Sequence, residues 1–118
     1  MNYIELDVWK SSRELVKKVY LLSDLFPKEE LYALTNQVRR CSISIPSNIA
    51  EGLGRQSNKE TIHFLYISKG SLYELETQLY LAFDLQYISE EQLENILTKI
   101  TTCKKLLNGF INYFKSKK

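Results

Sequence analysis

The residues best placed to do metal chemistry in this sequence are Glu60 and His63. A Glu-x-x-His spacing puts two ligands on one helical face, as in di-iron four-helix bundles. Such sites need a second Glu-x-x-His pair and two more glutamates. Because His63 is the only histidine in the chain, we expect no metal site.

Covalent or phosphate chemistry has equally little support. A serine or cysteine nucleophile needs a general base beside it, and His63 is the single histidine available. Helical RNA-cleaving domains often pair an arginine with a histidine a few positions later. Here only Arg55 and His63 could form such a pair, and a turn and a helix cap separate them. The segment GLG at 52–54 lacks the lysine and the preceding strand of a phosphate-binding loop. We therefore predict no catalytic residue and no cofactor, and a protein that is not an enzyme.

The length and composition of the chain are typical of one folded domain. The chain has 118 residues, 44% apolar and 25% charged, and we expect a single domain over residues 1–118. Its net charge of +2 is too small to require a nucleic-acid partner. Because neither a signal peptide nor a membrane-length apolar run is present, we expect a cytoplasmic protein with no membrane partner. Cys41 and Cys103 lack CxxC spacing and are interpreted as reduced core residues.

Apolar residues recur with helical period in four segments, at about 7–24, 28–53, 57–86 and 89–114. The last two segments open with Ser57-x-x-Glu60 and Ser89-x-x-Gln92, which are capping-box patterns. Gly52 and Gly54 are expected to end the second helix. Short links between long helices favour antiparallel neighbours. The pattern predicts an all-α fold, an antiparallel up-down four-helix bundle.

The stretch RRCSISIPSNIAEGLGR at residues 39–55 places Pro46 inside the second segment. The apolar period continues in phase through the proline, so we expect one helix that is bent at Pro46. Proline removes the helical hydrogen bond to the Ser42 carbonyl. We expect the neighbouring hydroxyls to satisfy the freed carbonyls, namely those of Ser42, Ser44 and Ser47.

Tyrosines recur every seven residues along the third segment, at Tyr66, Tyr73, Tyr80 and Tyr87. Seven residues are nearly two helical turns, so these side chains form one stripe, one position from the row of Leu65, Leu72 and Leu79. Tyrosine is typical of interfaces because its ring buries area while its hydroxyl stays hydrogen-bonded. The stripe favours self-association through Tyr66, Tyr73 and Tyr80. Stacking of nucleic-acid bases is the alternative.

Two groups of basic residues are candidates for phosphate binding. Lys10, Arg13 and Lys17 fall on one face of the first helix, and three arginines flank the proline segment, namely Arg39, Arg40 and Arg55. Phosphate contacts of this kind are independent of sequence and sensitive to salt. A solvated face, or internal pairs with Glu14, Glu74 and Glu76, is the alternative.

Several stretches together resemble a known family. They are RRCSISIPSNIAEGLGR at 39–55, FLYISKGSLYELETQLYLAFDL at 64–85, YISEEQ at 87–92 and ELDVWKSSRELVKKVY at 5–20. They are similar to bacterial four-helix bundle proteins associated with intervening sequences of 23S ribosomal RNA genes, sometimes labelled S23 ribosomal proteins. The resemblance covers nearly the whole chain.

The resemblance implies an up-down four-helix bundle without established catalytic residues. The family is similar to the accessory protein of diversity-generating retroelements, which forms a pentameric ring and assists a reverse transcriptase and its RNA. The resemblance therefore implies a homo-oligomer, a pentameric ring, with RNA or DNA and a further, unidentified protein as partners. We expect a non-enzymatic, RNA-associated accessory protein. The alternative is a purely structural protein–protein interaction module.

Asn48 and Glu51 complete the set of candidate residues. They lie one turn apart on the expected second helix. In a close-packed ring, they would contact polar groups of the third helix, Ser71 and Glu74, or of a neighbouring subunit. We interpret Pro46, Asn48 and Glu51 as a structural joint, with Pro46 setting the bend.

Overall fold

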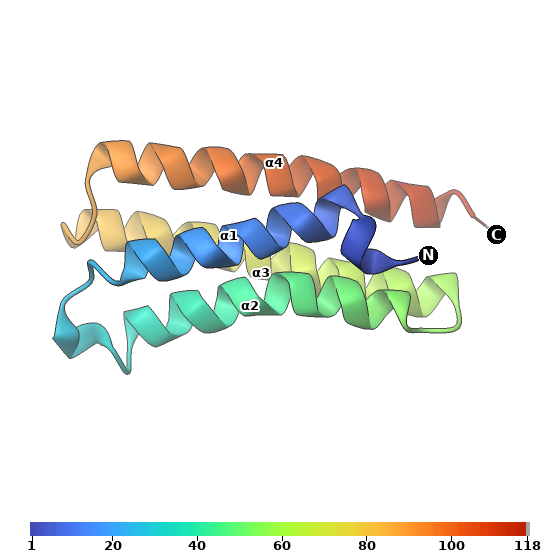
Figure 1. Ribbon diagram of the computed structural model, residues 1–118, viewed down its shortest axis with the longest axis horizontal. Helices are drawn as coiled ribbons and strands as arrows, with labels where there is room; N and C mark the ends of the chain where they lie inside the picture. Colours follow the sequence, from blue (N-terminus) through green and yellow to red (C-terminus); the bar gives the residue numbers. More distant parts are fainter. Residues whose placement is uncertain (118) are drawn as a thin grey trace.

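The computed structural model describes residues 1–117 and shows four long helices (Figure 1). They are α1 (Asp7–Ser23), α2 (Leu34–Leu53), α3 (Asn58–Asp84) and α4 (Glu90–Lys115). Two short 3₁₀ helices complete the secondary structure, η1 (Tyr3–Glu5) and η2 (Lys28–Glu30). Within residues 1–117 there is no β-strand.

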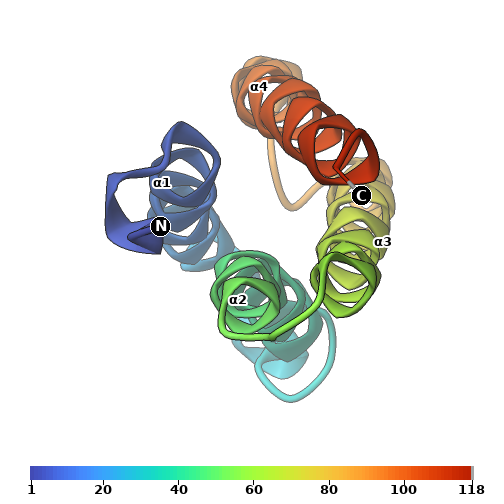
Figure 2. The ribbon, with the colours of Figure 1, turned by 90° about the vertical axis from the view of Figure 1, so that its right-hand side faces the viewer.

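The four helices occupy the corners of a bundle in chain order (Figure 2). Each helix packs against its neighbours in sequence, and α1 closes the bundle by packing against α4. Successive helices run in opposite directions, so both termini lie at one end (Figure 1). The bundle measures 48 × 25 × 21 Å. The predicted all-α, antiparallel four-helix bundle is confirmed.

The core follows the apolar period of the sequence. On α3 the leucine row is buried completely or nearly so, at Leu65, Leu72 and Leu79. It meets equally buried side chains of the other helices, among them Ile45, Ile49, Ile100 and Leu107. Each such burial stabilises the fold by roughly 1.5–3 kcal/mol. Because this core fixes how the four helices pack, it also fixes which side chains lie on the surface of the bundle.

The start of α2 differs from the prediction. Residues 28–30 form a separate 3₁₀ helix, and α2 begins at Leu34 rather than near Lys28. The Glu30 carboxylate accepts hydrogen bonds from the Leu34 backbone N–H at 3.2 Å and the Tyr87 hydroxyl at 2.5 Å. The bond to Tyr87 joins residues that are far apart in the chain. The apolar period between 28 and 34 therefore does not determine the local backbone.

Pro46 lies within one continuous helix, as predicted, while a bend there stays a prediction. The expectation for the serine hydroxyls was wrong at all three positions, since within residues 1–117 none of them bonds to the Ser42 carbonyl and the Ser47 hydroxyl makes no hydrogen bond. Ser42 Oγ donates to the Arg39 carbonyl at 2.8 Å, and Ser44 Oγ lies 2.9 Å from Ser71 Oγ on α3. The Ser42 and Ser44 hydroxyls therefore make contacts within α2 and between α2 and α3.

Gly52 has a packing role that the sequence did not indicate. The helix ends one residue later at Leu53, with Gly54 as its C-cap. Thr61 Oγ1 donates to the Gly52 carbonyl at 2.7 Å. A Cβ atom at position 52 would lie 3.0 Å from the Phe64 Cβ and 3.1 Å from the Thr61 carbonyl oxygen. Glycine therefore permits the close approach of α2 and α3.

The two helix starts predicted from serine caps are present. Ser89 and Gln92 form a complete capping box at the start of α4. At α3, the Ser57 hydroxyl accepts from the Glu60 N–H at 3.2 Å, without the return bond from Glu60. These caps fix where the two longest helices begin.

Both cysteines are buried and free of disulfides. Burial raises the pKa of the Cys41 thiol to about 12, with the Glu74 charge as a second cause. Burial likewise raises the pKa of the Cys103 thiol to about 11. The folded protein therefore keeps both sulfurs as neutral thiols at physiological pH, which makes them poor nucleophiles.

We expect both thiols to react at least a hundredfold more slowly with a disulfide reagent at pH 8 in the native protein than after denaturation. Above their ordinary pKa of 9.0, the unfolded chain releases protons that the folded chain retains. The free energy of unfolding should therefore fall as the pH rises from 9 towards 12. Thiol titration with and without guanidinium measures the first effect, and rapid native labelling would contradict it.

Candidate nucleic-acid interface and oligomer surface

The basic face of α1 is solvent-exposed and unpaired. Lys10, Arg13 and Lys17 are all exposed, at steps of three and four residues. None of them forms an ion pair within residues 1–117. The Arg13 guanidinium instead lies 5.4 Å from the centre of the Trp9 ring. These three cations are available to an external anion.

The three arginines of the proline segment differ from one another. Arg39 joins α1 to α2, since its guanidinium donates to Asp24 at 2.7 Å and to Ser23 Oγ at 2.8 Å. It also lies over the Tyr20 ring, 4.7 Å from the ring centre. Arg40 is exposed and forms no ion pair within residues 1–117. Of this pair, Arg40 is the residue available to a ligand.

Arg55 is engaged locally. Its guanidinium lies 3.4 Å from the Glu51 carboxylate and 4.6 Å from the centre of the Phe64 ring. Both partners of the ion pair are largely exposed, so the pair adds little stability. The six basic candidates thus divide into four unpaired cations, at Lys10, Arg13, Lys17 and Arg40, and two paired ones, at Arg39 and Arg55.

Asn48 reaches α3 through a serine rather than directly. Its side-chain amide donates to the Ser44 carbonyl at 2.8 Å and to Ser44 Oγ at 2.9 Å. Ser44 Oγ lies 2.9 Å from Ser71 Oγ. Glu51 takes no part in these contacts and pairs with Arg55. Of the two predicted joint residues, Asn48 belongs to the α2–α3 polar contact.

Three tyrosines form an exposed stripe along α3. Tyr66, Tyr73 and Tyr80 are 41%, 47% and 48% exposed, respectively. Ile67 and Leu81 extend the exposed apolar surface of α3, and Leu85 follows at its C-cap. Large apolar side chains that remain exposed along a whole helix are typical of a protein interface.

Lysines border the tyrosine stripe on its α4 side. Lys104 Nζ lies 4.2 Å from the centre of the Tyr73 ring and donates to Glu76 at 2.8 Å. Lys115 Nζ lies 5.1 Å from the centre of the Tyr66 ring. These cation–π contacts favour the present positions of the Tyr66 and Tyr73 rings.

Tyr87 does not belong to the stripe. It follows the end of α3, its ring packs on Phe26 with ring centres 5.6 Å apart, and its hydroxyl donates to Glu30. The Glu30 contact raises the pKa of Tyr87, and the same hydrogen bond lowers the pKa of Glu30. Tyr87 therefore anchors the loop between α1 and α2.

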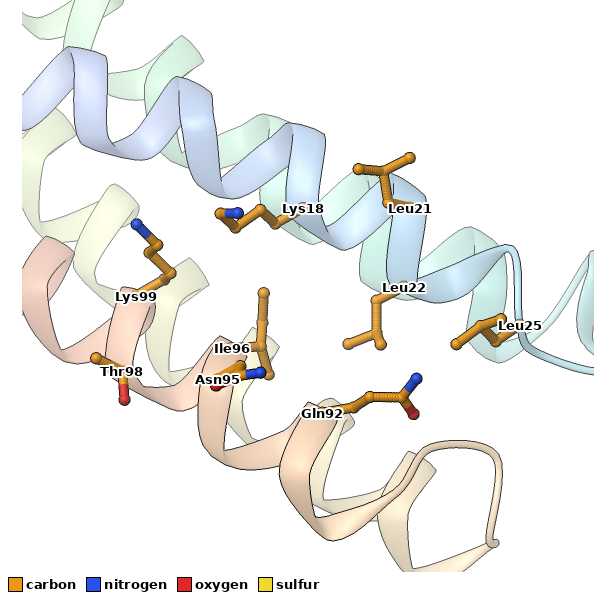
Figure 3. Close-up of a pocket in the computed structure, with 9 residues that line it drawn as sticks. All are labelled: Lys18, Leu21, Leu22, Leu25, Gln92, Asn95, Ile96, Thr98 and Lys99. Carbon is orange, nitrogen blue, oxygen red and sulfur yellow. The ribbon is translucent and has the colours of Figure 1, made fainter.

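A groove of about 520 Å³ lies between α1 and α4 (Figure 3). Its apolar wall comes from both helices and from the residue just after α1's C-cap, at Leu21, Leu22, Leu25 and Ile96. Lys18 of α1 and Lys99 of α4 both lie towards one end of it (Figure 3). Its lining combines apolar and cationic groups with amides and a threonine, without an acid or a histidine. Such a groove is suited to binding rather than to proton transfer.

The predicted absence of a metal site can be compared with the geometry around His63. His63 is exposed, and its ring meets Phe64 edge-on at 5.4 Å between centres. Across residues 1–117, no group of three His, Cys, Asp or Glu side chains is placed to hold a metal ion. In the same part of the chain, no helix is both long enough and apolar enough to span a membrane.

Sequence reasoning missed contacts that depend on packing. It did not identify the Glu30–Tyr87 bond or the Glu76–Lys104 pair, because their partners are 57 and 28 residues apart. It also did not identify the contacts of Trp9 with Tyr3 and Arg13 at the edge of the bundle. The signal in the sequence was the position of Trp9 directly before Lys10, the first residue of the basic row on α1.

Comparison with known proteins agrees with these features. The 23S rRNA-intervening sequence protein family matches residues 4–109. Among solved structures, the chain is similar to a protein of unknown function from the S23 ribosomal protein family of Bacteroides thetaiotaomicron VPI-5482. The two are 30% identical, with a TM-score of 0.82 and coverage of 89% of this chain and 95% of that chain. No curated protein matches the sequence. The resemblance predicted from the sequence is confirmed.

Proposed function

Because the chain belongs to the 23S rRNA-intervening sequence protein family, we propose that it is a non-enzymatic, self-associating cytoplasmic protein that binds RNA. One observation carries this proposal. Four cations without a carboxylate partner, at Lys10, Arg13, Lys17 and Arg40, lie on the adjacent helices α1 and α2.

The charge balance of this surface favours a polyanion over a neutral partner. Asp24 and Glu51 are occupied by Arg39 and Arg55. Glu14 is the remaining exposed acid of the middle of α1. The four unpaired cations are therefore opposed by few free carboxylates, although the whole chain carries a net charge of only +2. A local excess of this kind attracts phosphates, with an affinity that depends on salt.

Self-association would strengthen weak binding by each chain. The tyrosine stripe of α3 lies on a different helix from the unpaired cations, so the bundle can use α3 for assembly and α1–α2 for RNA. In a closed ring, such as the pentamer expected from the family resemblance, one RNA can contact several copies. Multivalent contacts raise the overall affinity without any new contact on each chain.

Fluorescence anisotropy of labelled single-stranded RNA and of duplex DNA, titrated at several salt concentrations, tests the proposal. For single-stranded RNA, each phosphate contact contributes about −0.7 to the log–log salt slope. Four contacts per chain therefore predict a slope of about −3 for one copy. Absence of binding at low salt would contradict the proposal.

Charge removal on the proposed face provides the matched comparison. We expect Lys10→Ala with Lys17→Ala to weaken RNA binding by about tenfold and to make the salt slope shallower. Lys105→Ala with Lys117→Ala removes the same charge from exposed positions of the C-terminal helix region. Equal losses in the two double variants would indicate general charge attraction rather than the α1–α2 face.

The α1–α4 groove favours a second candidate, a protein–protein interaction module. Its leucines and two lysines suit an apolar segment that carries carboxylates (Figure 3). Leu22→Glu would block such a segment while leaving the α1–α2 cations unchanged. A protein that binds no RNA but loses a co-purifying partner through Leu22→Glu would favour this module.

A further inference from the structure

A cleft of about 360 Å³ opens between α1 and α2, beside the unpaired cations. Trp9 and Val16 line it from α1, and Ile43 and Pro46 line it from α2. Tyr3 closes one side, with its ring edge-on to Trp9 at 5.3 Å between centres. The cleft is within the size range of small-ligand sites, about 300–1,000 Å³.

Pro46 suits the wall of such a cleft. Its ring presents carbon atoms and no N–H group, and one turn later Ala50 adds a small side chain to the lining. Pro46 and Ala50 therefore give the α2 wall compact apolar side chains. Pro46 therefore lines this cleft, a role that is separate from any bend in α2.

Polar groups at this cleft lack partners within the chain. Arg13 belongs to the lining and has no carboxylate partner within residues 1–117. The Trp9 indole N–H and the Ser47 hydroxyl make no hydrogen bond to another residue of that range. The lining thus combines aromatic and apolar side chains with a few donors, as in small-ligand sites.

We propose that this cleft receives one unpaired base of single-stranded RNA. The base ring replaces the Arg13 guanidinium over Trp9, and Arg13 moves to a flanking phosphate. Lys17 and Arg40 contact the neighbouring phosphates. This inference rests on the proposed RNA binding and specifies its site and its substrate class. Base stacking on aromatic side chains beside a basic surface is the usual way to bind single strands with little sequence preference.

The geometry selects a single strand over a duplex. Bases in a duplex are stacked on one another, and A-form RNA presents chiefly its backbone and a shallow minor groove. An apolar cleft is accessible to a base only after it leaves the stack. The excess of cations over carboxylates around the cleft favours a nucleotide over a neutral aromatic ligand.

Trp9 provides a direct measurement because it is the only tryptophan in the chain. We would titrate the full-length protein with octamers of uridylate and adenylate, and with an abasic octamer that carries the same number of phosphates. Trp9 fluorescence and anisotropy of the labelled octamers would be recorded together. We expect the octamers with bases to quench Trp9 and to bind about tenfold more tightly than the abasic one.

A substitution that fills the cleft separates base insertion from phosphate contact. Ser47 lines the cleft and is exposed, so Ser47→Phe should block the base without removing a cation, and Ser47→Ala is the control. We expect Ser47→Phe to reduce affinity to that of the abasic octamer. Trp9→Leu, measured by anisotropy alone, should do the same if Ser47→Phe fails to fold.

Three results would overturn the inference, and they can be distinguished. Equal affinity for abasic and base-containing octamers, without quenching, would overturn base insertion and leave the proposed RNA binding intact. No binding of any octamer at low salt would overturn both. If a glutamate-rich peptide containing phenylalanine quenches Trp9 and displaces the octamers, the cleft belongs to an acidic peptide.

Discussion

Gly52→Ala is expected to lower the free energy of unfolding by about 1–3 kcal/mol, the usual cost of overpacking a well-packed contact. The added Cβ would lie 3.0 Å from the Phe64 Cβ and 3.1 Å from the Thr61 carbonyl oxygen. The Thr61 atom is backbone and cannot rotate away. The substitution therefore forces α2 and α3 apart and weakens the hydrogen bond from Thr61 Oγ1 to the Gly52 carbonyl.

Gly109→Ala is the matched control, because it makes the same chemical change in an exposed part of α4. A Cβ atom at position 109 has no neighbour within 4 Å. Alanine in a helix restricts the unfolded chain, so we expect this variant to gain about 0.4–1 kcal/mol. Urea unfolding followed by circular dichroism, at one fixed protein concentration, measures both. If the two variants change stability in the same direction, close approach at Gly52 does not limit the packing of α2 on α3.

The bundle itself could be predicted because its period is local. Leu65, Leu72 and Leu79 lie on one face of any helix that contains them, and that face is the buried one. The start of α2 could not be predicted in this way. It depends on Glu30, which accepts from both Leu34 and Tyr87. Because Tyr87 is distant in sequence, helical period alone continued the helix too far towards its N-terminus.

The same distinction applies to the candidate site. Helical spacing grouped Lys10, Arg13 and Lys17 correctly on an exposed face. It could not separate Arg40 from its neighbour Arg39, because the partner of Arg39 is Asp24, 15 residues away on the other side of a loop. Which cations remain available to a ligand is a property of helix packing.

The role of Pro46 shows the same limit. Its sequence context indicated a continuous helix, and α2 is continuous. The surrounding serines suggested hydroxyls that bond to the carbonyls freed by Pro46. In the structure, the Ser44 hydroxyl instead bonds to the Ser71 hydroxyl on α3. The cleft beside Pro46 requires α1 as its other wall. No pattern within residues 39–55 contains that information.

Tyr73→Glu is expected to separate the proposed oligomer into monomers that keep the bundle fold. Tyr73 is the middle tyrosine of the α3 stripe and is 47% exposed. In an assembly that covers this stripe, a glutamate would have to lose its water, so we expect a loss of about 2 kcal/mol or more per interface. Such a loss weakens each contact by roughly thirtyfold.

The fold of the single chain should tolerate this change, because position 73 lies outside the core. The new carboxylate would also lie beside the Lys104 ammonium, which is 4.2 Å from the centre of the present ring. Tyr32→Glu is the control, since Tyr32 is 91% exposed in the loop before α2 and lies off the stripe. Sedimentation velocity at several concentrations, with circular dichroism for the fold, measures the outcome. An unchanged oligomer in Tyr73→Glu would exclude the α3 stripe as the assembly surface, because a glutamate in its centre could remain only where water still reaches it.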